Sequence, residues 1–187
     1  PAVTEDGVYF VSGPEDDEAG GGTLTRLNKN GEVVWTHTSE NGTARSSPVP
    51  GYGRVYYHTH AGSGDVLYAV DASSGDEDWR AEGDALVSYP PAVTEGRVYV
   101  IGSGTGTLTA LNAEDGSVEW KTENVASPIG RNIPTLHDGV VYFDIYGVCA
   151  DDGREVVRFE IEGEAAGGGV GPLAVNDDYL FVTSASG

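Results

Sequence analysis

The feature that most constrains this chain is an internal repeat of about 43 residues. Each copy begins with a Pro and small apolar residues, continues into an apolar strand, and ends in a turn-forming segment followed by a second strand. Successive copies are offset by 47, 43, 43 and 38 residues, because their first prolines are Pro1, Pro48, Pro91, Pro134 and Pro172. A period of this length, filled with short apolar strands and Gly-rich turns, is typical of a β-propeller blade.

The end of each repeat carries an Asx residue, a Gly and a Trp at fixed spacing. The two best copies read AVDASSGDEDW over 69–79 and ALNAEDGSVEW over 110–120. A copy that is one residue shorter ends at Trp35, and a fourth copy over 147–157 keeps its Gly but has Val157 in place of Trp. An Asx side chain that bonds nearby backbone, followed by a Gly with positive φ, predicts a tight hairpin between the last two strands of each blade.

The three tryptophans are predicted to dock each blade onto its neighbour. An indole buries roughly 150 to 250 Å², which at about 25 cal/mol per Å² gives at most about 4 to 6 kcal/mol per blade. We therefore predict a structural role for Trp35, Trp79 and Trp120. In the fourth copy, Phe159 lies two residues after Val157, so we expect it to replace part of the missing indole.

These patterns predict an all-β fold, a β-propeller of four-stranded antiparallel blades. The expected blades cover residues 1–40, 47–84, 90–124 and 133–163, and a fifth begins over 171–187. Four blades and part of a fifth form no obvious closed ring. We interpret the chain as part of a longer propeller; the alternative is a homodimer in which two chains complete one ring and cover the open edges.

The charge balance excludes whole classes of partner. The chain has 30 acidic residues against 10 basic ones, for a net charge of -20, and such a surface repels nucleic acid and anionic lipid. Only Lys29 and Lys121 are lysines, and this composition indicates a halophilic archaeal source. No apolar run reaches the 18 residues of a membrane span, and the first residues do not form a signal peptide, so we predict no membrane insertion within this segment.

Two histidines have a spacing that is compatible with metal ligands. His58 and His60 are two residues apart on a predicted strand and therefore share a face, which is compatible with two imidazoles on one metal ion. No third ligand is identifiable, so we predict no metal site. His37 and His137 are isolated in the sequence and carry no signal.

Three short motifs have simple structural interpretations. The acidic run over 15–18 lacks the ligand spacing of a calcium loop and reads as a solvated hairpin tip. The Gly-rich run over 102–107 lies between two predicted strands, with no helix to present its N-terminus to a phosphate, so we interpret it as a hairpin. The sequon over 41–43 fits an exported protein.

The pattern Ala-x-Asx-x-x-x-Gly-x-x-x-Trp, preceded by Pro-Ala-Val and Val-Tyr-Val, resembles the repeat of the pyrroloquinoline quinone (PQQ) dehydrogenases and their non-enzymatic relatives. Those relatives include the lipoprotein scaffold of outer-membrane β-barrel assembly and extracellular sensor domains. The resemblance implies a propeller fold but leaves the function open, because the repeat maintains blade packing in enzymes and scaffolds alike.

The function we favour is a non-catalytic scaffold that binds a protein or envelope component and needs no cofactor. We expect it at the cell surface or in the envelope, with a cytoplasmic location as the alternative. As a dehydrogenase, the resemblance would imply PQQ, a Ca²⁺ ion, an Asp base and a disulfide between adjacent cysteines, but Cys149 is the sole cysteine. Asp144, Asp151 and Asn132 have suitable chemistry, yet no motif aligns them, so we assign no catalytic residue and leave any cofactor-binding residues unknown.

Overall fold

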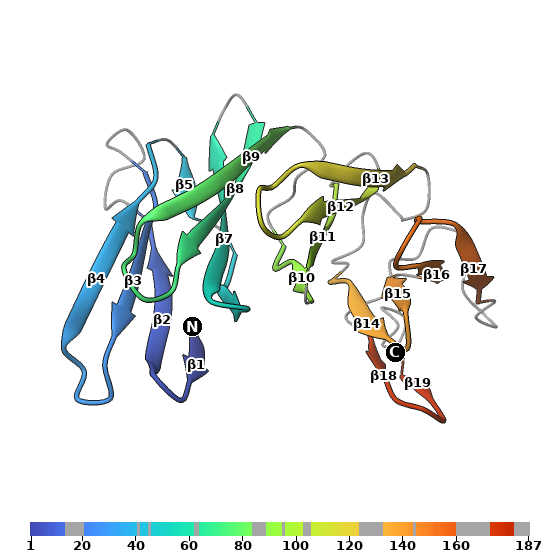
Figure 1. The fold of residues 1–187 in the computed structure, drawn as a ribbon, viewed down its shortest axis with the longest axis horizontal. Coiled ribbons are helices and arrows are strands. Elements are labelled where there is room, and N and C mark those ends of the chain that lie inside the picture. Colours follow the sequence, from blue (N-terminus) through green and yellow to red (C-terminus); the bar gives the residue numbers. More distant parts are fainter. Residues whose placement is uncertain are drawn as a thin grey trace, which may run out of the picture.

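The computed structural model describes residues 1–13, 21–40, 42–44, 46–61, 64–83, 89–94, 96–102, 106–123, 133–143, 145–159 and 173–181. These residues form β-strands and turns, and the sheets follow one another along an arc (Figure 1). Within the described ranges, no helix has the length and apolar character that crossing a membrane requires.

Four sheets share one layout, in which the strands pair in chain order and antiparallel. The first contains β1 (Ala2–Thr4), β2 (Gly7–Ser12), β3 (Thr23–Leu27) and β4 (Val33–Thr38). The second contains β6 (Val49–Gly51), β7 (Arg54–Ala61), β8 (Gly64–Asp71) and β9 (Glu77–Gly83), and the short β5 (Thr43–Ala44) also pairs with β7.

The third sheet contains β10 (Ala92–Val93), β11 (Arg97–Ile101), β12 (Leu108–Asn112) and β13 (Val118–Thr122). The fourth contains β14 (Thr135–His137), β15 (Val140–Phe143), β16 (Tyr146–Cys149) and β17 (Glu155–Arg158), and a last pair contains β18 (Ala174–Val175) and β19 (Leu180–Phe181). The predicted all-β fold of four-stranded antiparallel blades is confirmed. We number the sheets as blades 1 to 5.

The hydrophobic cores lie between blades, because each strand alternates its side chains between the two faces of its sheet. Blades 1 and 2 share a core that includes Tyr9, Leu24, Trp35, Val55, Tyr57, Tyr68 and Val70. Blades 2 and 3 share Tyr56, Leu67, Ala69, Trp79, Val98, Val100, Leu111 and Ala113. Blades 3 and 4 share Tyr99, Ile101, Leu108, Ala110, Val141, Phe143, Val148 and Ala150. Stacking of neighbours therefore supplies the burial that a single blade lacks.

The register aligns the blades residue by residue. Tyr9, Tyr56 and Tyr99 each pair with the first strand of their blade, and a β-bulge precedes the last hairpin of every complete blade. In the last pair, Ala174 opposes Phe181 as Thr135 opposes Tyr142. Leu173 therefore takes the place of Pro134 in this register, whereas Pro172 lies outside the described residues.

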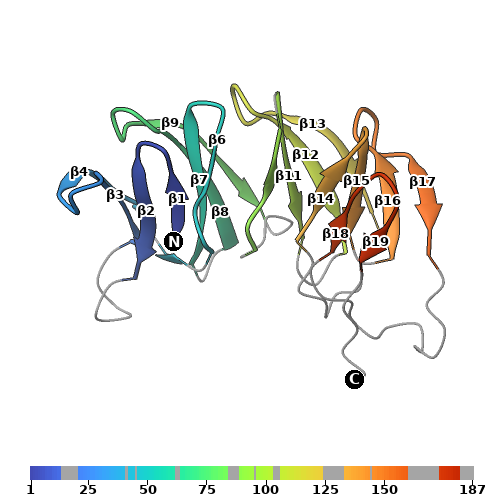
Figure 2. The same cartoon turned by 90° about the horizontal axis from the view of Figure 1, so that it is seen from below.

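Two sets of turns lie at the same end of the blades, which we call the turn face (Figure 2). One set joins the first and second strands, as at 52–53 and 138–139, and the other joins the third and fourth strands at 28–32, 72–76, 113–117 and 150–154. Antiparallel pairing in chain order brings these turns together. The Asx-Gly segments recognised in the sequence thus all lie on the turn face.

Candidate functional site

The tryptophans dock onto the turn of the following blade. Each indole Nε1 donates a hydrogen bond to the backbone carbonyl of the residue after the Asx position. The three bonds are Trp35 to Ala72 at 3.1 Å, Trp79 to Ala113 at 3.0 Å and Trp120 to Ala150 at 3.1 Å. The predicted docking role of these residues is confirmed, and the bond supplies the partner that a buried indole N–H needs.

The Gly of each turn onto which a Trp docks is needed for two structural reasons. Gly75, Gly116 and Gly153 have φ of 82°, 73° and 71°, the left-handed region that favours glycine. A Cβ at Gly116 would also lie 2.6 Å from Cε3 of Trp79, and one at Gly75 would lie 2.7 Å from Cδ2 of Trp35. The positive φ was predicted from the sequence, whereas the second reason, direct contact with an indole from the preceding blade, required the tertiary structure.

The Asx residues hold these turns as predicted. The carboxylate Oδ1 of Asp71 accepts hydrogen bonds from the backbone N–H groups of Ser73 and Ser74, each at 2.8 Å, and from the Ser73 hydroxyl. These donors, the Ser73 hydroxyl first, lower the pKa of Asp71 to about 2. Asn28 and Asn112 accept similar backbone bonds, so these three turns are held by bonds between side chain and backbone.

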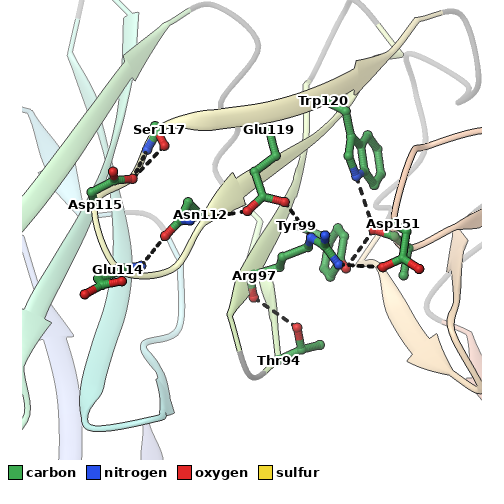
Figure 3. A network of polar contacts seen from close by, with 11 residues as sticks. Thr94, Arg97, Tyr99, Asn112, Glu114, Asp115, Ser117, Glu119, Trp120 and Asp151 are labelled. Atoms are coloured by element: carbon green, nitrogen blue, oxygen red, sulfur yellow. Dashed lines mark hydrogen bonds and ion pairs between the residues drawn. The ribbon is translucent and has the colours of Figure 1, made fainter.

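A charged network joins blades 3 and 4 beside Trp120 (Figure 3). Arg97 Nε donates to Oε2 of Glu119 at 2.6 Å, and Arg97 Nη1 donates to Oδ1 of Asp151 at 2.8 Å. The hydrogen bond to Glu119 is the largest of the effects that raise the pKa of Arg97. Asp151, a candidate by chemistry alone, is therefore tied to Arg97, and 83 % of its side chain is exposed.

This network was not predicted from the sequence, although comparison of the repeats indicates its pair of Arg and acidic residue. Arg54 and Asp78 form the corresponding pair in blade 2, with Arg54 Nε 2.6 Å from Asp78 Oδ2. In both blades the Arg begins the second strand and the acid immediately precedes the Trp. Blade 4 has Val140 and Val156 at these positions, so the two charges are lost together.

A second polar cluster lies between blades 1 and 2. His37 Nδ1 and the Tyr57 hydroxyl are 2.8 Å apart, and His37 Nε2 is 3.6 Å from Oε2 of Glu77. Desolvation lowers the pKa of His37 against an opposing effect of Glu77, and it raises the pKa of the fully buried Tyr57. A buried phenol with a raised pKa is a poor nucleophile at neutral pH. We interpret the cluster as a polar link between blades, and His37 is not isolated in the structure.

The two histidines of β7 have different surroundings. His60 is 45 % exposed in its side chain, and its Nδ1 is 2.7 Å from Oδ1 of Asp65. His58 is fully buried, and neither of its ring nitrogens has a hydrogen-bond partner among the residues that the structure describes. Across the described ranges, no three His, Cys, Asp or Glu side chains are grouped so that they could hold a metal ion.

The remaining candidate residues have separate locations. His137 Nε2 is 3.1 Å from Oδ1 of Asp177, and Cys149, half-buried, occupies the Asx position of the fourth turn. Phe159 contacts Tyr142 with ring centroids 6.3 Å apart, as Trp120 contacts Tyr99 at 5.9 Å, which supports its partial replacement of the missing indole. Asn132, Asp144, Asn41 of the sequon, the acidic run over 15–18 and residues 103–105 of the Gly-rich run lie outside the described residues.

Comparison with known proteins connects this architecture to one family. A family model described as outer membrane protein assembly factor BamB matches residues 1–90 and 20–145. Outer membrane protein assembly factor BamB of Escherichia coli (strain K12) is 35% identical over 111 residues, which cover 49% of this chain and 28% of that protein. The match thus spans just over a quarter of the length of this relative.

Solved structures show the same fold. The crystal structure of BamB from Moraxella catarrhalis superposes with a TM-score of 0.71 and 20% sequence identity, covering 95% of this chain and 58% of that one. A europium-containing methanol dehydrogenase superposes with a TM-score of 0.52 and 17% identity, covering 65% of this chain and 23% of that one. At these identities the likeness concerns the fold alone.

Proposed function

Because the chain belongs to the outer membrane protein assembly factor BamB family of PQQ-like repeat propellers, we propose that it is a non-catalytic scaffold that binds a protein partner. The family match over most of the chain carries this proposal, since the family description names an assembly factor. The three interblade docking bonds support it, because they fix the turns of successive blades relative to one another. A rigid arc of this kind offers an extended surface for recognition.

The partner-binding surface we propose is the turn face. Its turns at 72–76 and 113–117 are held by both Asx bonds and docked indoles, so little conformational entropy is lost when a partner binds there. The exposed charged side chains of its described residues are mainly acidic: Glu5, Asp6, Glu32, Asp76, Glu114, Asp115, Asp138, Asp151, Asp152, Asp177 and Asp178, against Lys29 and Arg154. We propose that the partner presents basic side chains, which pair with these carboxylates at direct contact, since salt screens their attraction over longer distances.

We further propose that the protein acts at the cell surface or in the envelope of a halophilic archaeon. The 30 acidic residues against 10 basic ones support the halophilic source, and the outer-membrane name of the family supports the location. Dense carboxylates keep a protein soluble where salt screens ordinary charge repulsion.

The scaffold proposal includes independence from PQQ and Ca²⁺. One cysteine, Cys149, leaves these 187 residues without the adjacent pair that the dehydrogenases' disulfide would need. Asp151, one of the acids with suitable chemistry, bonds to Arg97. The alternative remains a PQQ- and Ca²⁺-dependent dehydrogenase, which the following experiment separates from a scaffold.

A photo-crosslinking amino acid placed at Ser74 or Asp115 tests the turn face, and one at Thr36 on the outer strand β4 is the matched control. All three positions are exposed. In cells of the source organism, we expect Ser74 and Asp115 probes to capture the same envelope protein and the Thr36 probe to capture none. Reduction of a dye with an alcohol or sugar, dependent on added PQQ and Ca²⁺, would contradict the proposal and support the enzyme.

The alternative in which two chains complete one ring has its own test. Light scattering in molar KCl would give the 19.5 kDa of a single chain under the scaffold arrangement we propose. Twice that mass would show that a homodimer forms. The crosslinks from Ser74 and Asp115 would then be interpreted on the dimeric ring.

A further inference from the structure

His58 lies where blades 2 and 3 meet. In the register of β7 and β8 it is directly opposite Leu67, and it shares a sheet face with Tyr56 and Ala69. Those three neighbours belong to the core that blade 2 forms with Val98, Val100 and Leu111 of blade 3. The imidazole therefore lies at the edge of an otherwise apolar contact between two blades.

The same position is apolar in the neighbouring blades. Val11 opposes Leu24 in blade 1 and Ile101 opposes Leu108 in blade 3, as His58 opposes Leu67. His58 is 0% exposed, and within the described part of the chain both Nδ1 and Nε2 lack a hydrogen-bond partner. A neutral imidazole can be buried in this way at moderate cost, but an imidazolium without a partner cannot.

Among the described residues, no charged group is bonded to the His58 ring. On β7 the flanking residues of this face are Tyr56 and His60, with Arg54 beyond Tyr56. On β8 the carboxylates of this face are Asp65, which is bonded to His60, and Asp71, which is opposite Arg54 at the far end. The other packed elements contribute apolar or hydroxyl side chains within the described residues: Val49 of β6, Trp79 and Ala81 of β9, Val93 of β10, Val98 and Val100 of β11, and Thr109 and Leu111 of β12. Ser46 accepts a hydrogen bond from the backbone N–H of His58 and not from its ring.

We propose that His58 makes the contact between blades 2 and 3 sensitive to acid: protonation of its ring separates the two blades. Separation gives the imidazolium access to water, which the closed contact denies it. The inference concerns how the arc changes shape and does not depend on the proposed scaffold function.

The direction of the pH dependence follows from burial. Desolvation lowers the pKa of His58 from its ordinary 6.5 to about 3 in the closed state. The open state takes up the proton near the ordinary value, so the closed contact is fully stable above about pH 6.5 and loses stability progressively as pH falls toward 3. Each unit in this window multiplies the open fraction by about ten while that fraction is small.

The three tryptophans provide one reporter for each of the first three interfaces between blades. Trp35, Trp79 and Trp120 dock between blades 1 and 2, 2 and 3, and 3 and 4 respectively. The experiment is 19F NMR of the full chain labelled with 5-fluorotryptophan in molar KCl, with resonances assigned by single Trp→Phe variants. Between pH 6.5 and 4.5, the Trp79 resonance should broaden and move toward its unfolded position while the other two remain at their folded positions.

The chain offers matched controls. His58→Ile installs the residue that blade 3 uses at this position and should abolish the Trp79 response, and His58→Gln provides a neutral polar variant if the Ile variant does not fold. Ile101→His should create the same response at Trp120, between blades 3 and 4. His60→Gln should leave the Trp79 response unchanged, because His60 is half exposed and bonded to Asp65.

Two results would overturn the proposal. One is a Trp79 response that persists in His58→Ile and His58→Gln, since another group would then be titrating. The other is simultaneous loss of all three folded resonances in the wild-type protein, since the blades would then unfold together rather than separate at one contact.

Discussion

The contact between blades 2 and 3 differs from the junction between blades 4 and 5 in its outer half. Trp79 of β9 is 7% exposed and bonds to the next turn, whereas blade 4 has the half-buried Val157 at this position. Between blades 4 and 5, the described polar contacts start from the inner strand β14, where the Thr135 hydroxyl donates to the Leu173 carbonyl at 3.1 Å and His137 Nε2 is 3.1 Å from Oδ1 of Asp177. The indole thus joins the outer edges of two blades, while inner strands can meet without it.

The Asx-Gly-Trp repeat therefore stabilises the contact between two blades and not the single blade. The Trp belongs to one blade, but its Gly and carbonyl partners belong to the next. Loss of the Trp in blade 4 therefore weakens a contact without changing the strands of the blade itself, which remains four-stranded. The predictions below test this separation.

The largest effect is expected for Trp79→Ala. Removal of a buried indole leaves a cavity and unpairs the Ala113 carbonyl, and such truncations cost about 3 to 5 kcal/mol. Val157→Ala at the corresponding position should cost less than about 1.5 kcal/mol, because less surface is buried there. Urea denaturation followed by far-UV circular dichroism measures both. Equal losses would show that the two interfaces do not differ as described.

Gly116→Ala and Gly31→Ala separate backbone strain from indole contact. Both residues have positive φ, 73° and 82°, but nothing lies within 4 Å of a Cβ at Gly31, whereas Trp79 lies beneath Gly116. The Gly31 variant should lose about 1 to 2 kcal/mol of unfolding free energy, because alanine disfavours a positive φ. The Gly116 variant should lose about 2 to 4 kcal/mol, because the indole must also move. The same denaturation assay applies, and a larger loss at Gly31 would contradict the docking interpretation.

Arg97→Ala is expected to have a smaller effect. Its pairs with Glu119 and Asp151 are partly exposed and screened by salt, so the loss should be about 1 kcal/mol or less and should shrink further in molar KCl. Arg54→Ala, which removes one described pair, should cost less than Arg97→Ala at low salt. A double-mutant cycle with Asp151→Ala measures the coupling energy between Arg97 and Asp151 across blades 3 and 4. Zero coupling at low salt would show that this pair does not stabilise the contact.

Asp71→Asn should have the smallest effect at neutral pH, because Asn28 and Asn112 hold equivalent turns. Native hydrogen bonds lower the pKa of Asp71 from 3.8 to about 2. Its carboxylate therefore adds stability above about pH 4, and that contribution is lost as pH falls toward 2. The variant should lack this pH dependence when thermal unfolding is followed between pH 5 and 2. Its window of about pH 4 to 2 overlaps only the lower end of the His58 window, which runs from about pH 6.5 to 3.

Several features of the fold and site were predictable from local chemistry. The Asx-Gly turns, the four-stranded antiparallel blades and the docking role of the tryptophans follow from residue spacing, since a turn and a strand depend on a few consecutive residues. The Arg97 and Glu119 pair was also readable by comparing repeats, because blade 2 has Arg54 and Asp78 in the same places.

Other features could not be read from the sequence, because they depend on which side chains meet across blades. His37 looked isolated until the fold placed Tyr57 and Glu77 beside it. His58 and His60 looked equivalent as a pair on one strand face, yet the neighbouring blade buries one and leaves the other near solvent.

The repeat, the strand order within each blade and the docking tryptophans follow from the sequence, because strands are set by a period of two residues and turns by local chemistry. The contact of Gly116 with an indole from the preceding blade, and the lack of a ring partner for His58 among the described residues, depend on how the blades pack. Burial and pairing of a side chain depend on the surface opposite it, and in this fold that surface belongs to a different repeat.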